Sequence, residues 1–402
     1  MNQPASRPAT EGHEPRWIFL LPQVTPGPRG GLVGGYANSV AALVELPNPH
    51  EVVIIGGTHH EDAWGASGLA KRLSDVAFID LPMRSPPTST AYYCEFMARA
   101  TAAARRLRCS VVYGHSGHPA YALASALMAR ATGASSVHCI YCPFSDEFQQ
   151  RRVGFIQRVP SVLGLRRVDG LAAISRNVGR SLEGLARGRN IEIIPPALPK
   201  RFYRTTNHVA ADGVVTLGFV GHHRSEKGLD IALQAVQRAA SSNRQVRLVI
   251  LATGAESRGA PDELRELLNM FAVRDRVVLL SGVEDMFDFY NQLDFLLVPF
   301  RATRGPSDYP LVLLEALALG LPTVSTPVGA IPELVTDSLN GFLATSATGD
   351  AFADALERAL RTDGSAVGEL TRRARASAEA FRADCVAEAT AAYLRSFEKT
   401  GA

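Results

Sequence analysis

The segment VVTLGFVGHHRSEKGLD, residues 214–230, joins a buried strand to a helix through a short polar loop. Its first seven residues are mostly apolar, as a strand inside a parallel sheet requires. Gly221 follows that strand, the loop carries Arg224 and Lys227, and a helical pattern starts after Gly228. A glycine turn with cationic side chains before a helix start favours an anion site. The alternative is an ordinary strand-to-helix loop with basic surface residues.

Outward from this segment, short apolar runs alternate with helical stretches along the whole chain. This alternation predicts the α/β class, with parallel sheets covered on both faces. It breaks near residues 196–212, a stretch that begins rich in proline, so we expect two doubly wound, Rossmann-like domains. The expected parts are a disordered tail at 1–15, an N-terminal domain at 16–205, a C-terminal domain at 212–375, and a C-terminal helix at 376–402.

Two more segments of the C-terminal half follow the same logic. In PSDYPLVLLEALALGLP, residues 306–322, Pro310 starts an apolar helix, and the N–H groups of Leu311 and Val312 are open to an anion. Glu315 lies one turn inside that helix, where a carboxylate needs donors. Ligand hydroxyls or protein groups would satisfy it. TPVGAIPELV, residues 326–335, is another glycine loop that leads into a proline-started helix.

Taken together, these segments resemble the retaining glycosyltransferases of family 4, also called group 1. That family has the GT-B fold, in which two doubly wound domains face each other across a cleft. Its motifs are matched in order and spacing by Gly221, Glu226, Lys227, Gly228, Glu315, Ala316, Ala318, Gly320, Pro322, Gly329, Pro332, Glu333, Asn340, Gly341 and Leu343.

The resemblance implies an acceptor-binding domain at 16–205, a nucleotide-sugar-binding domain at 212–375 and a C-terminal helix at 376–402 that packs back toward the N-terminal domain. It also implies roles for particular residues. Lys227 and a neighbouring basic residue bind the donor diphosphate, Glu315 binds the donor ribose, and His115 lies over the donor sugar. The implied catalytic residues are His115, Lys227 and Arg224. The implied donor-binding residues are Gly34, Gly35, Gly221, His222, Gly282, Val283, Ser307, Asp308, Leu311, Val312 and Glu315.

Two positions depart from the family's pattern. His222 stands where the family has an arginine, and Arg224 is the candidate replacement. Ser307 stands where the family has the first glutamate of its E-x7-E motif. Either Asp308 takes that role, or Ser307 fills it more weakly, or the sugar is unusual.

Evidence in the N-terminal half is weaker. His115 follows a predicted strand, and a capped structural histidine is the alternative interpretation. Cys139 and Cys142 form a C-x-x-C pair that lacks a second pair of similar spacing, so a zinc site is not expected. The basic and apolar stretch 148–167 is consistent with weak contact with anionic lipid. A solvated face or an acceptor-loop wall is favoured there, because Gly154, Pro160 and Gly164 interrupt a continuous helix.

Composition narrows the function classes. The net charge of +3 implies no nucleic-acid partner, and five cysteines in 402 residues imply no disulfide framework. We expect a cytoplasmic protein, with the inner face of the membrane as a peripheral site.

The function implied by the resemblance is transfer of a sugar from a nucleoside-diphosphate sugar to an unidentified acceptor, with retention of configuration and without metal or cofactor. The alternatives are an epimerase of such sugars, a phosphorylase-like enzyme of the same fold, or a non-catalytic binding protein.

The absence of any D-x-D triplet predicts that activity does not need a metal ion that bridges the diphosphate. Backbone N–H groups, a helix dipole and Lys227 would stabilise the leaving group instead. Activity should therefore be unchanged in excess EDTA. Loss of activity in EDTA, followed by recovery with added Mn²⁺ or Mg²⁺, would show the prediction to be wrong.

Overall fold

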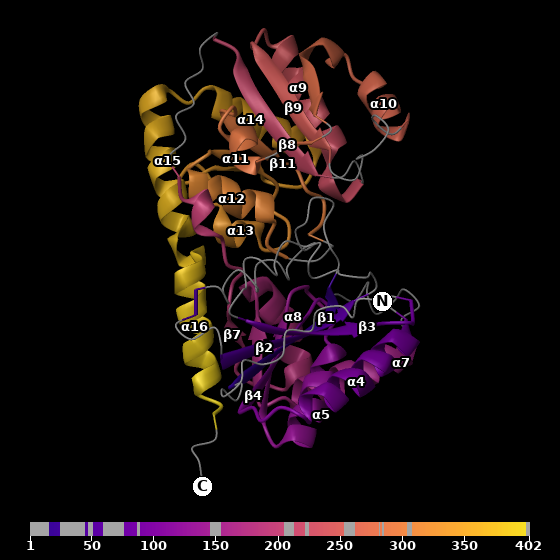
Figure 1. Cartoon of the computed structure of the whole chain (residues 1–402). Coiled ribbons are helices and arrows are strands. Elements are labelled where there is room, and N and C mark those ends of the chain that lie inside the picture. The colour runs from indigo at the N-terminus through magenta and orange to yellow at the C-terminus, as the bar shows by residue number, and fades with distance from the viewer. Residues whose placement is uncertain are drawn as a thin grey trace, which may run out of the picture. The chain divides into compact units, whose positions relative to one another are not determined.

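The computed structural model describes residues 16–24, 45–46, 51–58, 76–86, 89–144, 154–204, 213–221, 225–252, 262–280, 282–283, 285–303 and 308–398. The chain divides into two units (Figure 1). Unit 1 comprises Met1–Ala197, Gly305–Asp308 and Ala383–Ala402, and unit 2 comprises Leu198–Arg304 and Tyr309–Arg382. The division after Ala197 falls within the break expected near residues 196–212, and the chain returns to unit 1 at Ala383 rather than at residue 376. The tail expected at 1–15 lies outside the described residues.

Unit 1 contains a parallel sheet of seven strands in the order β3-β2-β1-β4-β5-β6-β7. Near-continuous apolar strands form it because helices cover both faces; all seven residues of β2, for example, are buried. The strands are β1 (Trp17–Val24), β2 (Val52–Thr58), β3 (Ala77–Pro82), β4 (Val111–Ser116), β5 (Ser135–Ile140), β6 (Gly170–Ala173) and β7 (Glu192–Ile193). The described helices are α4 (Thr90–Ala104), α5 (Tyr121–Thr132), α7 (Gly154–Arg167), α8 (Arg176–Ala186) and α16 (Ala383–Arg395).

The last helix of the chain, α16, is part of the core of unit 1 (Figure 1). Its buried face includes Val386 and Leu394, which join the cluster formed by the sheet. Just beyond the helix, the Glu398 carboxylate accepts a hydrogen bond of 2.9 Å from the Trp17 indole N–H. The end of the described chain is therefore tied to the first strand.

Helix α7 corrects one expectation from the sequence. Residues 154–167 form one helix although Pro160 lies inside it. Gly164 explains part of this, because a Cβ there would come within 2.4 Å of the Leu123 backbone nitrogen on α5. Close packing of α7 on α5 offsets the hydrogen bond that a proline removes. Among the described residues, no helix is both long enough and apolar enough to cross a bilayer.

Unit 2 contains a parallel sheet of six strands in the order β10-β9-β8-β11-β12-β13. Together the two sheets confirm the expected α/β class with two doubly wound domains. The strands are β8 (Val215–Gly221), β9 (Val246–Ala252), β10 (Val277–Leu280), β11 (Phe295–Val298), β12 (Thr323–Ser325) and β13 (Phe342–Leu343). The helices are α9 (Leu229–Ser241), α10 (Asp262–Asn269), α11 (Met286–Tyr290), α12 (Leu311–Leu319), α13 (Ile331–Leu334), α14 (Gly349–Leu360) and α15 (Gly364–Ala378), with 3₁₀ turns η2 (Lys200–Phe202), η3 (Ser225–Lys227), η4 (Arg274–Arg276) and η5 (Glu379–Phe381).

Two neighbouring loops of unit 2 are held together at Gly228, the residue before α9. Its φ is 68°, and a Cβ there would come within 1.9 Å of the Pro299 carbonyl oxygen. Arg301 continues this contact: its backbone N–H donates to the Glu226 carbonyl, and its guanidinium pairs with Asp230. The loops after β8 and β11 are thereby fixed against each other.

We predict that Gly228→Ala destabilises unit 2 by roughly 3 kcal/mol or more, because it adds a backbone clash to the strain of a left-handed alanine. Gly213→Ala is the matched control, since the φ of Gly213 is 69° but a Cβ at this position would meet no atom of the described residues within 4 Å. That variant should lose only about 1–2 kcal/mol. Denaturant unfolding of both variants measures the difference, and equal losses would refute the role of Pro299.

Candidate functional site

The candidate site lies at the point of the unit 2 sheet where the strand order reverses. Strands β8 and β11 are neighbours, but the chain continues from β8 to β9 toward one edge of the sheet and from β11 to β12 toward the other edge. Parallel sheets bind ligands outside the carboxyl ends of strands at such a point. The loops that leave β8 and β11 carry Lys227 and Phe300 respectively, and Thr326 follows β12.

Lys227 is the cation at this point. It is half-buried in η3, and its Nζ lies 4.0 Å from the centroid of the Phe300 ring. Burial lowers the pKa of Lys227 from its ordinary value, and the charge of Glu226 opposes this shift. Thr326 donates a hydrogen bond to the Phe300 carbonyl, so the backbone at the ring is also fixed. A lysine held on a ring in this way is a positioned cation rather than a freely mobile surface charge.

Helix α12 starts at Leu311, with Pro310 in extended conformation before it. Leu311 and Val312 are half-buried in its first turn. N–H groups of a first turn have no partner inside the helix, and the dipole makes this end positive. The N-terminus of α12 therefore follows the carboxyl end of β11, as predicted.

Glu315 lies one turn into α12 and is half-buried. Its Oε2 accepts a hydrogen bond of 2.6 Å from the hydroxyl of Tyr290, which is fully buried on α11. Burial raises the pKa of Glu315 to about 7, although the Tyr290 hydrogen bond and the charge of Arg201 both lower it. Sequence reasoning considered ligand hydroxyls or protein donors for this carboxylate, and the structure supplies one protein donor.

Gly282 and Val283 precede α11 and are half-buried. Asp285 caps that helix, accepting a hydrogen bond of 3.0 Å from the Phe287 N–H. Val283 and Phe287 pack at the edge of the core that contains Tyr290. This part of the expected donor site is thus an apolar surface next to Glu315.

Asp308 has a different environment from the one expected. It is fully buried and groups with unit 1, where its Oδ2 accepts hydrogen bonds from the Ser175 hydroxyl at 2.7 Å and the Asn177 amide at 3.0 Å. Its backbone N–H donates to the Tyr141 carbonyl. These contacts favour an anchor over a sugar ligand, because the carboxylate already has protein donors.

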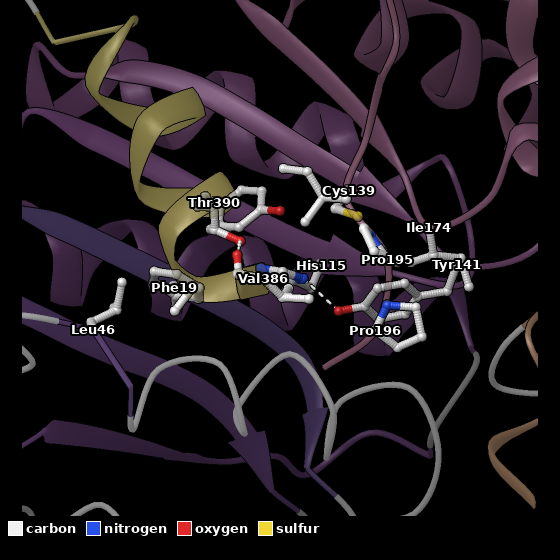
Figure 2. Close-up of a pocket in the computed structure, with 13 residues that line it drawn as sticks. Phe19, Leu46, His115, Cys139, Tyr141, Ile174, Pro195, Pro196, Val386 and Thr390 are labelled. Atoms are coloured by element: carbon white, nitrogen blue, oxygen red, sulfur yellow. Dashed lines mark hydrogen bonds between the residues drawn. The ribbon is translucent and has the colours of Figure 1, made fainter. Parts of the chain in front are cut away.

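His115 is enclosed in unit 1 rather than open to a sugar. Its exposed fraction is 3%, and its Nδ1 lies 2.5 Å from the Tyr141 hydroxyl. Figure 2 shows the ring beside Val386 and Thr390 of α16, in the wall of a cavity of about 20 Å³. Burial, with a smaller contribution from His138, holds the pKa of His115 well below its ordinary value. His115 is closed off from a sugar because α16 covers this face of β4, and the sequence did not reveal that contact.

Several expected residues lie outside the described part of the chain. They are Gly34, Gly35, His222, Arg224 and Ser307. Gly221 is the last residue of β8, as expected. Within the described residues, no group of three or more His, Cys, Asp or Glu side chains could hold a metal ion.

Sequence reasoning missed Tyr290, Phe300 and Arg301. Phe300 and Arg301 lie in the loop that follows β11, so the rule that loops after parallel strands form sites could have found them. Tyr290 had no such signal, because its contact with Glu315 depends on how α11 packs against α12.

Comparison with known proteins gives matches over part of the chain. Residues 214–362 match the family described as "Glycosyl transferases group 1". A D-inositol 3-phosphate glycosyltransferase of Xylanimonas cellulosilytica is 34% identical over 178 residues, which are 44% of this chain and 40% of the relative. The enzyme of the same name from Saccharomonospora viridis is 34% identical over 183 residues, 43% of this chain and 40% of the relative. The match thus spans two fifths of the length of these relatives.

Solved structures resemble the whole chain. HepE of Anabaena in complex with UDP has a TM-score of 0.73 and 17% identity, and the match covers 95% of this chain and 100% of that one. Sucrose-phosphate synthase of Thermosynechococcus elongatus has a TM-score of 0.72 and 16% identity, with 95% and 98% covered. At this identity the likeness concerns the fold, and it confirms the expected GT-B type.

The buried carboxylate of Glu315 predicts a pH dependence of stability. Its pKa in the folded chain, about 7, lies above the ordinary value of 4.5, so the ionised form destabilises the folded state. This destabilisation is absent below the lower pKa, grows between the two and is complete above the higher. Glu315→Gln should therefore match the wild type near pH 4 and be more stable near pH 8, by about 1–2 kcal/mol after allowance for solvent.

Denaturant unfolding of both proteins from about pH 4 to 8 measures this difference. Tyr290→Phe is the companion variant, because it removes a hydrogen bond that lowers the pKa of Glu315. The free energy of unfolding that this variant loses relative to the wild type should therefore increase from pH 4 to pH 8. A stability difference that does not vary with pH would refute the assignment.

Proposed function

Because residues 214–362 match the group 1 glycosyl transferases, we propose that this chain transfers a sugar from a nucleoside-diphosphate donor to an acceptor. The observation that carries the proposal is that a positioned cation, a helix N-terminus and a carboxylate that accepts from a hydroxyl all lie on segments that follow the neighbouring strands β8 and β11. These are Lys227, the start of α12 and Glu315.

Each group suits one part of the donor. The diphosphate would lie between Lys227 and the N–H groups of Leu311 and Val312, which together offer positive charge and hydrogen-bond donors. The ribose hydroxyls would donate to the Glu315 carboxylate, which is partly ionised near neutral pH because its pKa is about 7. A donor that replaces solvent at Glu315 supplies the hydrogen bonds that a half-buried carboxylate needs.

Catalysis on this arrangement would be electrostatic. Breaking the bond between sugar and diphosphate leaves negative charge on the diphosphate oxygens. Lys227 is held on Phe300 and α12 is fixed by its core, so both charges are in place before the bond breaks. The proposal needs no metal ion in this step.

The finer parts of the function are also proposals. Unit 1 would bind the acceptor, and the anomeric configuration would be retained, as the family resemblance implies. Solved relatives that bind UDP or UDP-glucose support a uridine or similar nucleotide donor. Contact with anionic lipid through residues 148–167 gains support from Val159 and Leu163, which are 41% and 36% exposed on α7 close to Arg166 and Arg167.

We predict that Lys227→Met lowers transfer by about 10- to 100-fold, the effect of losing one charge-assisted hydrogen bond to phosphate. Methionine keeps the apolar stem on Phe300, so the fold should be unchanged. Arg361→Ala, just after α14, is the matched control, because it removes an equally cationic but exposed side chain. The measurement is release of nucleoside diphosphate from a labelled donor, with the products identified.

A folded Lys227→Met protein with activity within threefold of the wild type would contradict the role of Lys227. Products in which the sugar stays on the nucleotide would instead favour an epimerase, and phosphate-dependent release of sugar phosphate would favour a phosphorylase. Donor binding without any turnover would favour the non-catalytic alternative.

A further inference from the structure

Two exposed arginines lie where the chain enters unit 2. The Arg201 guanidinium stands 5.1 Å from the Phe202 ring centroid, and its charge acts on Glu315 of α12. The Arg204 guanidinium stands 5.4 Å from the ring centroid of Phe287 on α11. Both side chains are exposed to solvent. The segment 198–204 therefore adds positive charge beside the proposed donor site, from a part of the chain that carries none of the recognised motifs.

The contact between α11 and α12 locates Arg204 relative to the donor. Tyr290 and Glu315 join the two helices by their hydrogen bond. Phe287 lies one turn before Tyr290, on the same side of α11. With the ribose on Glu315 and the diphosphate toward Lys227, as proposed above, the nucleobase would extend toward α11. There it would meet the half-buried apolar surface of Val283 and Phe287, and Arg204 is held over the Phe287 ring.

We propose that Arg204 is a specificity-determining residue for the nucleobase of the donor. Held over Phe287, its guanidinium donates a hydrogen bond to a carbonyl oxygen of the base. A guanidinium has five N–H donors and no acceptor. Uracil and guanine present carbonyl oxygens, whereas adenine presents an amino group at the corresponding edge. The chain therefore selects a uracil or guanine nucleotide over an adenine nucleotide; this inference rests on the proposed function.

Arg201 provides the matched control. It is also exposed, also lies over an aromatic ring and belongs to the same segment, but its charge acts on Glu315 and its ring contact is with Phe202 rather than Phe287. Its charge attracts any nucleotide diphosphate regardless of the base. Removing Arg201 should thus change affinity without changing selectivity, whereas removing Arg204 should change selectivity.

The test is calorimetric titration of UDP, GDP and ADP into the wild type, Arg204→Ala and Arg201→Ala. We expect the wild type to bind UDP or GDP at least tenfold more tightly than ADP. Arg204→Ala should weaken binding of the preferred nucleotide about tenfold and leave ADP within twofold, because ADP never used the hydrogen bond. Arg201→Ala should weaken all three nucleotides by similar factors.

The outcomes separate the inference from the function beneath it. Equal weakening of all three nucleotides by Arg204→Ala, or a wild type that prefers ADP or shows no preference, would overturn the role of Arg204 while the donor site stands. Failure of the wild type to bind any nucleoside diphosphate would overturn the proposed function, and this inference with it.

Discussion

At Gly228 the chain turns into α9 with its α-carbon so close to the carbonyl oxygen of Pro299 that a Cβ would approach it to 1.9 Å. This contact joins the loop after β8 to the loop after β11, which are the two loops that meet at the change in strand order. Lys227 precedes the glycine and Phe300 follows the proline, so the same contact brings the ammonium group onto the ring. The Arg301–Asp230 ion pair acts in the same direction, but it is exposed and contributes less. The position of the cation therefore depends on the close backbone packing at Gly228 as well as on its own contact with Phe300.

Glu315, unlike Lys227, occupies a position in the candidate site that lowers the stability of the fold. An apolar helix would be more stable with a leucine or alanine at this position, because a half-buried carboxylate loses hydration. Tyr290 returns one hydrogen bond, and its own hydroxyl is buried in doing so. Burial still raises the pKa of Glu315 to about 7, so the lost hydration of the carboxylate is only partly compensated. A ligand with hydroxyl groups can supply further hydrogen bonds, which links the instability of this carboxylate to recognition.

The fold could be predicted from the sequence because strand and helix patterns are local. Apolar runs such as 52–56 and 246–251 coincide with β2 and β9, and Pro310 and Gly320 flank α12 as expected. Candidate residues lie on the expected elements where a motif gave both residue type and spacing, as for Lys227 and Glu315, and their roles stay predictions. The environments of His115 and Asp308 depend on segments distant in sequence, namely α16 and the start of α8. Such contacts leave no local pattern, and the same is true of Pro160, which α7 accommodates by packing closely on α5.

The membership of α16 in unit 1 has a consequence for how the chain is made. Residues 1–197 emerge from the ribosome first, but the cavity wall that contains His115 and Tyr113 is completed only by Val386, Ala387 and Thr390. During synthesis of the intervening 185 residues, from Leu198 to Arg382, these aromatic side chains lack the helix that packs on them in the finished chain. Until α16 is made, these side chains of unit 1 lack their apolar cover, whereas all of unit 2 has been synthesised once Arg382 is reached. The unit that is synthesised first is therefore the one that is completed last.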